Sequence, residues 1–102
     1  MNDGLKDAHR AAIIDILSAN PRVERAVLFG SRATGTFASG SDVDIALFGD
    51  ALTLDDQAKL IEKVGESSIP QQVDLLLHHR IKSRELLDHI ERDGVEWFRR
   101  HS

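Results

Sequence analysis

The feature that most constrains this chain is the segment FGSRATGTFASGSDVDIALF, residues 29–48. It joins two short apolar runs, residues 23–29 and 43–48, through a stretch rich in glycine, serine and threonine. We interpret both runs as β-strands, because they are short and rich in large or β-branched residues. Successive strand side chains point to opposite faces, so Asp42 and Asp44 share one face. Two carboxylates therefore stand side by side at the start of an otherwise apolar strand.

Amphipathic helical patterns lie on both sides of this segment. Residues 5–19 carry apolar side chains at spacings of three and four, which predicts a helix that ends before Pro21. Thr53 and Asp56 stand three residues apart, as in a capping box, and predict a second helix that ends near Gly65. We therefore expect helices both before and after the two strands.

The C-terminal third adds a strand and a last helix. Residues 72–77 are mostly apolar and carry Asp74 as their only charge, which predicts a third strand. Ser83 is expected to cap a helix whose inward face carries Leu86, Leu87, Ile90, Trp97 and Phe98. Because helices and strands alternate along the chain, we expect one α/β (α+β) domain over residues 1–102. Its core would be a small mixed sheet of at least three strands with helices on one face.

Composition limits the class of partner. The chain has 102 residues, of which 41% are hydrophobic, and no cysteine, so disulfides and thiolate metal sites are excluded. Its N-terminus lacks the apolar stretch of a secretory signal, and no apolar run approaches the roughly 20 residues that span a bilayer. We therefore expect a cytoplasmic protein without a membrane partner. The formal net charge of −4 disfavours nucleic acid as a partner.

Gly30 and Ser31 follow the first strand directly, where the chain must turn. Small residues at such a turn let an anion approach the backbone N–H groups, and a serine hydroxyl adds a donor, so the pair is a candidate phosphate anchor. The glycine spacings of P-loops and of dinucleotide-binding loops are both missing. A turn of this composition is also common in purely structural roles.

Three aspartates are candidate metal ligands. Asp42 and Asp44 place their Cα atoms ~6.5–7 Å apart on one strand face, which suits one or two Mg²⁺ ions. A dication would also remove the repulsion between the two carboxylates. Asp74 is the only charge in QVDLLLH and needs a partner if it is buried. The alternatives are a turn cap for Asp42, a solvent-facing position for Asp44, and an arginine or solvent partner for Asp74.

The histidines give no further site. His78 and His79 follow the third strand, and adjacent strand side chains point to opposite faces, so we expect surface or packing roles for both. No partner spacing is present around the other three: His9, His89 and His101. The aromatic pair Trp97 and Phe98 is expected to close the core, with docking of a partner as the alternative.

The glycine-serine turn and the paired aspartates also carry a family resemblance. GS at residues 30–31, ten further residues and then DVD at residues 42–44 match GSx10DxD, the signature of the DNA polymerase beta-like nucleotidyltransferases. Within that superfamily the chain resembles the minimal nucleotidyltransferases (MNT), the MntA-type antitoxins of HEPN/MNT toxin–antitoxin systems. FGSRATGTFASGSDVDIAL is similar to their FGSRARG…SDxDLA, and QVDLLL to their third-carboxylate strand. The resemblance implies a polymerase beta-like nucleotidyltransferase core from Val23 to the last helix.

The resemblance implies transfer of a nucleotidyl group from a nucleoside triphosphate, here ATP, to a hydroxyl, with release of pyrophosphate. Asp42 and Asp44 would hold Mg²⁺ on the triphosphate, with two ions expected. Asp74 would complete the second metal site or act as general base toward the acceptor hydroxyl. The resemblance assigns binding of the phosphates to three neighbouring residues: Gly30, Ser31 and, as a charge partner, Arg32.

The resemblance also implies a HEPN-domain partner in a hetero-oligomer. In the toxin–antitoxin members, AMP passes from ATP to a tyrosine of the toxin. Larger family members carry a second domain that holds the base or the acceptor; this chain ends soon after Trp97, so a partner protein is expected to supply that part. Where MNT proteins read GSRARG, residues 33–35 are Ala-Thr-Gly, so one arginine and the phosphate contact it would make are missing.

Two other functions stay open from the sequence. One is a binding module that neutralises or scaffolds a partner, with a vestigial or merely nucleotide-sensing site. The other is a nucleotidyltransferase that acts on RNA or on a small hydroxylated molecule such as an aminoglycoside. The acidic charge balance and the missing acceptor domain count against the second.

Overall fold

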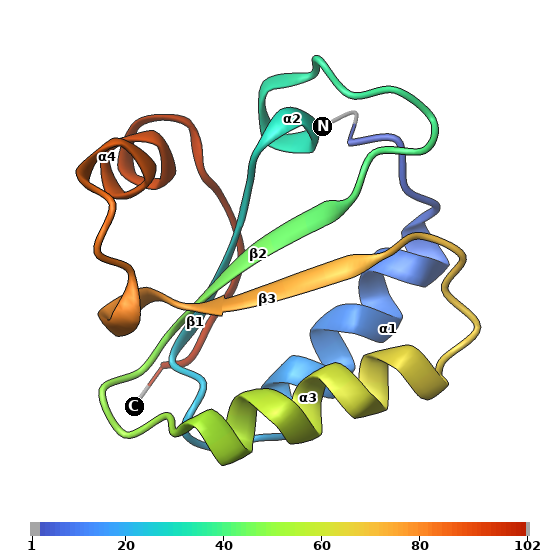
Figure 1. The fold of residues 1–102 in the computed structure, drawn as a ribbon. Helices are drawn as coiled ribbons and strands as arrows, with labels where there is room; N and C mark the ends of the chain where they lie inside the picture. The colour runs from blue at the N-terminus through green and yellow to red at the C-terminus, as the bar shows by residue number, and fades with distance from the viewer. Residues whose placement is uncertain (1–2, 102) are drawn as a thin grey trace.

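A computed structural model describes residues 3–101, which form a single sheet with helices packed on it (Figure 1). The strands of the described chain are β1 (Arg25–Phe29), β2 (Val43–Phe48), β3 (Val73–Leu77) and β4 (Val95–Arg99). They lie in the order β3-β2-β1-β4; β1 is antiparallel to β2 and β4, and β2 is parallel to β3. The expected mixed sheet is confirmed.

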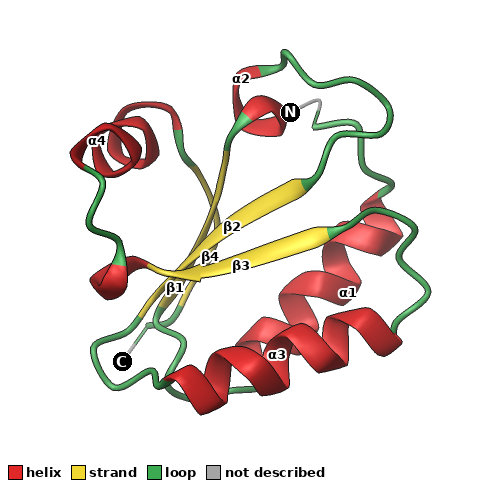
Figure 2. Cartoon of the chain, in the orientation of Figure 1, coloured by secondary structure: helices red, strands yellow, loops and turns green. Residues whose placement is uncertain are grey.

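Helices cover both faces of this sheet (Figure 2). They are α1 (Asp7–Ser18), α2 (Ser31–Thr34), α3 (Leu54–Glu66) and α4 (Arg84–Asp93), with a 3₁₀ turn η1 (His78–Arg80). Helices α1 and α3 lie together on one face, and α4 lies on the other. The prediction that all helices share one face is therefore wrong for α4. No helix in the described residues is long and apolar enough to cross a membrane.

The two faces of the sheet carry two clusters of buried apolar side chains. In β1, Ala26 and Leu28 belong to the larger cluster, which includes residues of α1 and α3. Val27 and Phe29 point the other way and pack with Ile90 of α4. Because β1 is buried on both faces from Ala26 onward, residues 26–29 are a continuous apolar run without polar alternation. This central strand holds the Gly30 turn at its end.

The C-terminal segment differs from the prediction. Ser83 caps α4 as expected, because its hydroxyl oxygen accepts a hydrogen bond from the Leu86 amide at 3.2 Å. The helix, however, ends at Asp93, and the chain continues as the strand β4. Gly94 lies at the change from helix to strand, where a Cβ would collide with the Ile90 carbonyl oxygen.

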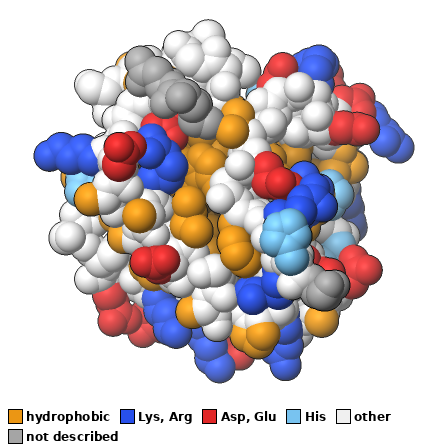
Figure 3. Space-filling model, turned by 180° about the vertical axis from the view of Figure 1, so that it is seen from behind, with side chains coloured by type: hydrophobic (Ala, Val, Ile, Leu, Met, Phe, Trp, Pro, Cys, Tyr) orange, Lys and Arg blue, Asp and Glu red, His pale blue; other side chains and the backbone are white. Residues whose placement is uncertain are grey.

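Pairing with β1 explains why this last segment is a strand. Trp97 has the spacing of an inward helical position, but Ala26 of β1 pairs with Phe98, and Leu28 pairs with Val95. Trp97 and Phe98 are half-buried and pack against the larger cluster, which confirms their expected role in closing the core. Seen from behind, the molecule shows hydrophobic side chains between charged ones (Figure 3).

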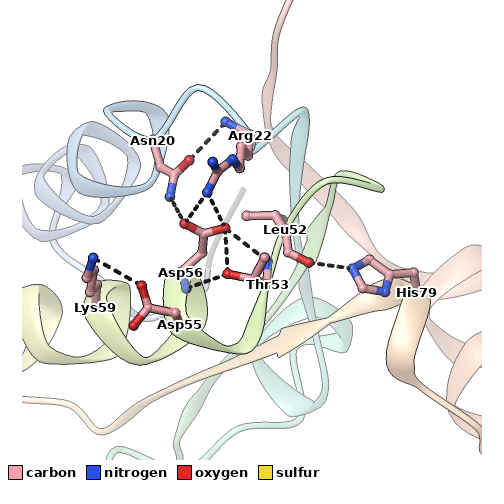
Figure 4. Close-up of polar contacts among 8 residues, drawn as sticks. All are labelled: Asn20, Arg22, Leu52, Thr53, Asp55, Asp56, Lys59 and His79. Carbon is pink, nitrogen blue, oxygen red and sulfur yellow. Dashed lines mark hydrogen bonds and ion pairs between the residues drawn. The ribbon is translucent and has the colours of Figure 1, made fainter.

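The predicted capping box at the start of α3 is present and belongs to a wider network (Figure 4). Asp56 accepts hydrogen bonds from the Thr53 amide and hydroxyl at 2.9 and 3.0 Å. Arg22 and Asn20, in the connection between α1 and β1, donate to the same carboxylate at 3.1 and 3.3 Å. The carboxylate thus ties the start of α3 to the turn that follows α1.

This network predicts a pH dependence of stability. The Thr53 amide, more than any other group, lowers the pKa of Asp56 from 3.8 to about 2 against the opposing effect of burial. A depressed native pKa contributes stability that is present above the unfolded value and is lost as the pH falls from about 4 to about 2. We expect Asp56→Asn to lower the Tm at pH 7 and to flatten the fall in Tm across that pH window.

Thermal melts monitored by circular dichroism between pH 2 and pH 7 would measure both effects. Asp55→Asn is the matched control, since Asp55 is exposed and pairs only with Lys59 among the described contacts. Equal pH profiles for the two variants would contradict the prediction.

Candidate active site

The structure brings Asp44 and Asp74 together on the face of the sheet that carries α4. Asp44 in β2 pairs in register with Asp74 of β3 on one side and with Phe29 of β1 on the other. Neighbouring strands lie about 4.8 Å apart, and paired residues point to the same face, so the two carboxylates are adjacent. Asp42 is exposed and immediately precedes β2. The three aspartates therefore gather at one end of β2 and β3.

The electrostatics of Asp44 reflect this crowding. Burial raises the pKa of the Asp44 carboxyl, and the negative charges of Asp74 and Asp42 raise it further. An ionised Asp44 is thus costly in the folded protein unless a cation lies beside it. Stability associated with this carboxyl is lost as the pH rises from 3.8 through its raised native pKa.

Gly30 lies against Asp44 and has a backbone conformation that favours glycine. Its φ is +78°, and a Cβ built there would stand 2.5 Å from Asp44 Oδ2. An L-residue would therefore be strained twice, by its backbone and by the carboxylate. The short helix α2 starts at Ser31, directly after this turn. The glycine is what allows the candidate phosphate anchor to contact the candidate metal ligand.

His89 of α4 also reaches this turn, which the sequence analysis missed. Its Nε2 accepts a hydrogen bond from the Gly30 amide at 2.8 Å, and its Nδ1 lies 3.2 Å from Asp93 Oδ2. The ring also meets Phe29 edge-on, with centroids 6.2 Å apart. Gly30 and His89 are 59 residues apart, so no local spacing could have revealed their contact. Only the spacing of four residues between His89 and Asp93 on one helix could have drawn attention to that pair.

Arg32 does not have the position predicted for it. Its side chain is 1% exposed, and its guanidinium donates to the carbonyls of Asp3, Ser39 and Ser41 at 2.8, 3.4 and 2.9 Å. It also lies 5.0 Å from the centre of the Phe37 ring. These contacts hold the connection between α2 and β2 against the N-terminal segment. Since its donors are engaged inside the protein, we do not place Arg32 among the phosphate-binding residues.

Asp3, whose carbonyl accepts a hydrogen bond from Arg32, is itself held in place by several contacts. Asp3 is fully buried and accepts hydrogen bonds from the Leu5 amide at 3.0 Å and from Arg10 Nε at 2.8 Å. Burial alone would raise the pKa of Asp3, but the hydrogen bonds from Arg10 and Leu5 lower it overall. Arg32 therefore bonds to the carbonyl of a residue that a part-buried ion pair with Arg10 holds in place.

The aspartate carboxylates suit a magnesium ion that also keeps water or phosphate ligands. No group of three or more His, Cys, Asp or Glu side chains within residues 3–101 is arranged to hold a metal by itself. The adjacent carboxylates of Asp44 and Asp74 line an open hollow of about 440 Å³, together with Phe29 and Ile61. Mg²⁺ is usually bound by one or two carboxylates together with waters and substrate phosphates. The oxygen ligands and their mutual repulsion fit that mode of binding.

Other polar features lie away from these aspartates. The ring of His78 stacks on Phe48 with centroids 4.0 Å apart, and His79 Nε2 lies 3.0 Å from the Leu52 carbonyl (Figure 4). Their separate packing contacts agree with the roles expected from the sequence. A hollow of about 530 Å³ lies between α1 and α3, next to Asp56. None of the three candidate aspartates lines it.

Comparison with known proteins adds a family and several structural relatives. A family model described as Polymerase beta, Nucleotidyltransferase matches residues 11–102. No curated protein matches the chain. In a crystal structure of a toxin–antitoxin with AMP-PNP, one chain is 29% identical with a TM-score of 0.74, over 89% of this chain and 73% of that chain.

Two further solved structures are similar. A mutant of the MntA–HpeT toxin–antitoxin contains a chain that is 30% identical, with a TM-score of 0.70, over 94% of this chain and 74% of that one. A structure of a tri-AMPylated HEPN toxin of Shewanella oneidensis with an MNT antitoxin has a chain of 24% identity and TM-score 0.70, with coverages of 94% and 74%. At that lower identity the likeness is one of fold.

Proposed function

This chain belongs to the Polymerase beta nucleotidyltransferase family, and on that premise we propose that it transfers AMP from ATP to a tyrosine hydroxyl of a HEPN-domain partner. It would thereby act as the antitoxin of that partner, in a Mg²⁺-dependent reaction. The family match and the fold place it among nucleotidyltransferases. The nucleotide, the acceptor and the metal are the proposed part.

One observation carries this proposal: Gly30 lies against Asp44, and Asp44 pairs in register with Asp74. The Gly30 N–H is engaged by His89, so a phosphate at the Gly30–Ser31 turn would be held by Ser31, and it would lie next to both carboxylates. That juxtaposition brings together what nucleotidyl transfer requires, an anchor for the leaving phosphates and oxygen ligands for a cation near the reacting phosphorus. A domain that merely bound a partner would have no need to keep repelling carboxylates together.

Each group has a role in the proposed reaction. The acceptor oxygen attacks the α-phosphorus of ATP, a new P–O bond forms, and the bond to the bridging oxygen breaks to release pyrophosphate. Asp44 and Asp42 would hold Mg²⁺, which when bound neutralises charge on the triphosphate. Ser31 and the turn would position the leaving phosphates. Asp74 lies on the edge strand, nearest to an acceptor that arrives from outside the sheet, and would take the hydroxyl proton.

The structural relatives support the choice of nucleotide and partner. The relative at 29% identity comes from a toxin–antitoxin structure with AMP-PNP, an ATP analogue. In the Shewanella oneidensis complex the HEPN toxin is AMPylated, which is the modification proposed here. The partner would form a hetero-oligomer with this chain and complete the site around the nucleotide.

Labelled ATP tests this function directly. The protein is incubated with Mg²⁺ and the protein encoded by the neighbouring gene, once with ATP labelled at the α-phosphate and once with the label at the γ-phosphate. We expect label on the partner only from the α-position, and none when EDTA removes the metal. Label from the γ-position would indicate a kinase instead. No label from either position would favour a partner-binding module.

A further inference from the structure

The Gly30 peptide is held from two sides by groups that are far apart in the sequence. Asp44 crowds its Cα, at a place where a Cβ would come within 2.5 Å of the carboxylate. On its amide side, the Gly30 N–H donates to His89 Nε2 at 2.8 Å. The turn is thus fixed between β2 and α4, although it belongs to neither element.

The hydrogen bonds define the tautomer of His89. A backbone N–H can only donate, so Nε2 must offer its lone pair to Gly30. The ring proton is then on Nδ1, which donates to Asp93 Oδ2 at 3.2 Å, one helical turn further along α4. Arg92 Nε donates to the same carboxylate oxygen at 3.1 Å. Asp93 therefore orients the imidazole, and the imidazole orients the Gly30 peptide.

We propose that His89 is a positioning residue that fixes the Gly30–Ser31 turn relative to Asp44. The inference rests on the proposed function for its catalytic consequence, but the contact itself stands without it. A small rotation of the Gly30 peptide would carry Ser31 and the turn away from the carboxylates. Misplacement of a reacting group by about 1 Å can cost about 100-fold in rate.

Two other roles for His89 fit the contacts less well. A metal ligand needs a free ring nitrogen, but Nε2 is engaged by Gly30 and Nδ1 by Asp93. A general base needs the same lone pair that the amide occupies. The side chain is 25% exposed and touches the edge of Phe29, so its ring is oriented by packing as well. These contacts together favour positioning.

A pair of substitutions separates positioning from packing. His89→Gln places an amide oxygen at about the reach of Nε2 and can accept from the Gly30 amide, whereas His89→Met fills a similar volume with only a weakly accepting thioether sulfur. The matched control is His101→Gln, the same change at an exposed histidine. Asp93→Ala removes the group that orients the ring and lies near the end of α4, where a failure to fold is not expected.

Hydrogen exchange of the Gly30 amide, followed by NMR, measures the hydrogen bond to His89 independently of enzymatic activity. We expect this amide to be protected in the wild type and in His89→Gln. In His89→Met it should exchange at least about tenfold faster than in the wild type, and Asp93→Ala should give an intermediate rate. In the AMP-transfer assay, kcat/KM for ATP should fall about 10- to 100-fold in His89→Met and by no more than about threefold in His89→Gln.

The outcomes distinguish this inference from the proposed function. Equal protection of Gly30 in the wild type, His89→Met and Asp93→Ala would overturn the inference, as would equal kcat/KM in the Gln and Met variants. If His89→Met does not fold, the Asp93→Ala comparison with wild type decides alone. If the wild type transfers no AMP while Gly30 exchange follows the expected order, the contact stands and the proposed function fails.

Discussion

Replacement of Asp44 by asparagine is expected to lower the rate of AMP transfer by at least about 100-fold without lowering the Tm. Asparagine has nearly the same shape as aspartate but carries no charge, so the packing around Gly30 and Phe29 should persist. What is lost is an anionic oxygen ligand for Mg²⁺, a cation that binds carboxylates far better than amides.

The stability of the Asp44 variant should be unchanged or higher because of the charges that surround the position. Burial and the negative charges of Asp74 and Asp42 raise the pKa of Asp44, which means that folding makes ionisation of this carboxyl less favourable than it is in the unfolded chain. Removal of that charge relieves the repulsion. Loss of activity without loss of stability is the signature of a residue retained for chemistry rather than for folding.

Steady-state transfer of α-labelled AMP and thermal melts, each with and without Mg²⁺, would test this expectation. Mg²⁺ should raise the Tm of the wild type, because a ligand that binds only the folded state stabilises it, and should have little effect on Asp44→Asn. Asp50→Asn is the matched control, as Asp50 is exposed beyond the far end of β2. A variant that transfers AMP at the wild-type rate would remove Asp44 from the site.

Arg32→Met is expected to lower the free energy of unfolding by about 2–4 kcal/mol, a large part of the stability of a small domain. Arg32 is 1% exposed and its guanidinium donates to the carbonyls of three residues. Its removal takes this donor from the buried carbonyl of Asp3 and from the part-buried bonds to Ser39 and Ser41. The connection between α2 and β2 would lose its tie to Asp3. The Tm should fall by about 10 °C or more.

The lysine variant distinguishes this structural role from phosphate binding. An ammonium group keeps the charge but cannot reproduce the planar fork of donors, so Arg32→Lys should also be strongly destabilised. If Arg32 instead served a phosphate, the lysine variant would keep its Tm and change mainly the KM for ATP. Urea denaturation and thermal melts measure the difference, with Arg80→Met, at an exposed arginine of η1, as control.

Local patterns in the sequence were sufficient for much of the fold. The strand at residues 43–48 has the predicted bounds, and the capping box of Thr53 and Asp56 is present. These features depend on side-chain alternation and on contacts between residues three apart, which leave a direct imprint on the sequence. The same alternation predicted that Asp42 and Asp44 share a strand face, but Asp42 lies just before β2, and the role of both as metal ligands remains a prediction.

The features that the sequence did not reveal depend on contacts between distant segments. Residues 95–99 form β4 because the outer edge of β1 offers a pairing partner. This pairing outweighs the helical spacing of apolar residues, which had predicted an inward position for Trp97 on a helix. Arg32 was expected to face a phosphate but is buried against Asp3, which lies 29 residues away. Neither partner is visible in the local pattern.

The sequence by itself determined most of the helices and strands, though not β4, together with the turn after β1 and the strands that carry Asp44 and Asp74, because each depends on periodicity or on residue types within a few positions. The tertiary structure alone decided that Asp44 and Asp74 stand in register, that α4 covers the face they share, and that His89 holds Gly30. The physical reason is one of range: periodicity and caps act over a few residues, whereas strand register and helix docking are decided by packing across the whole sheet.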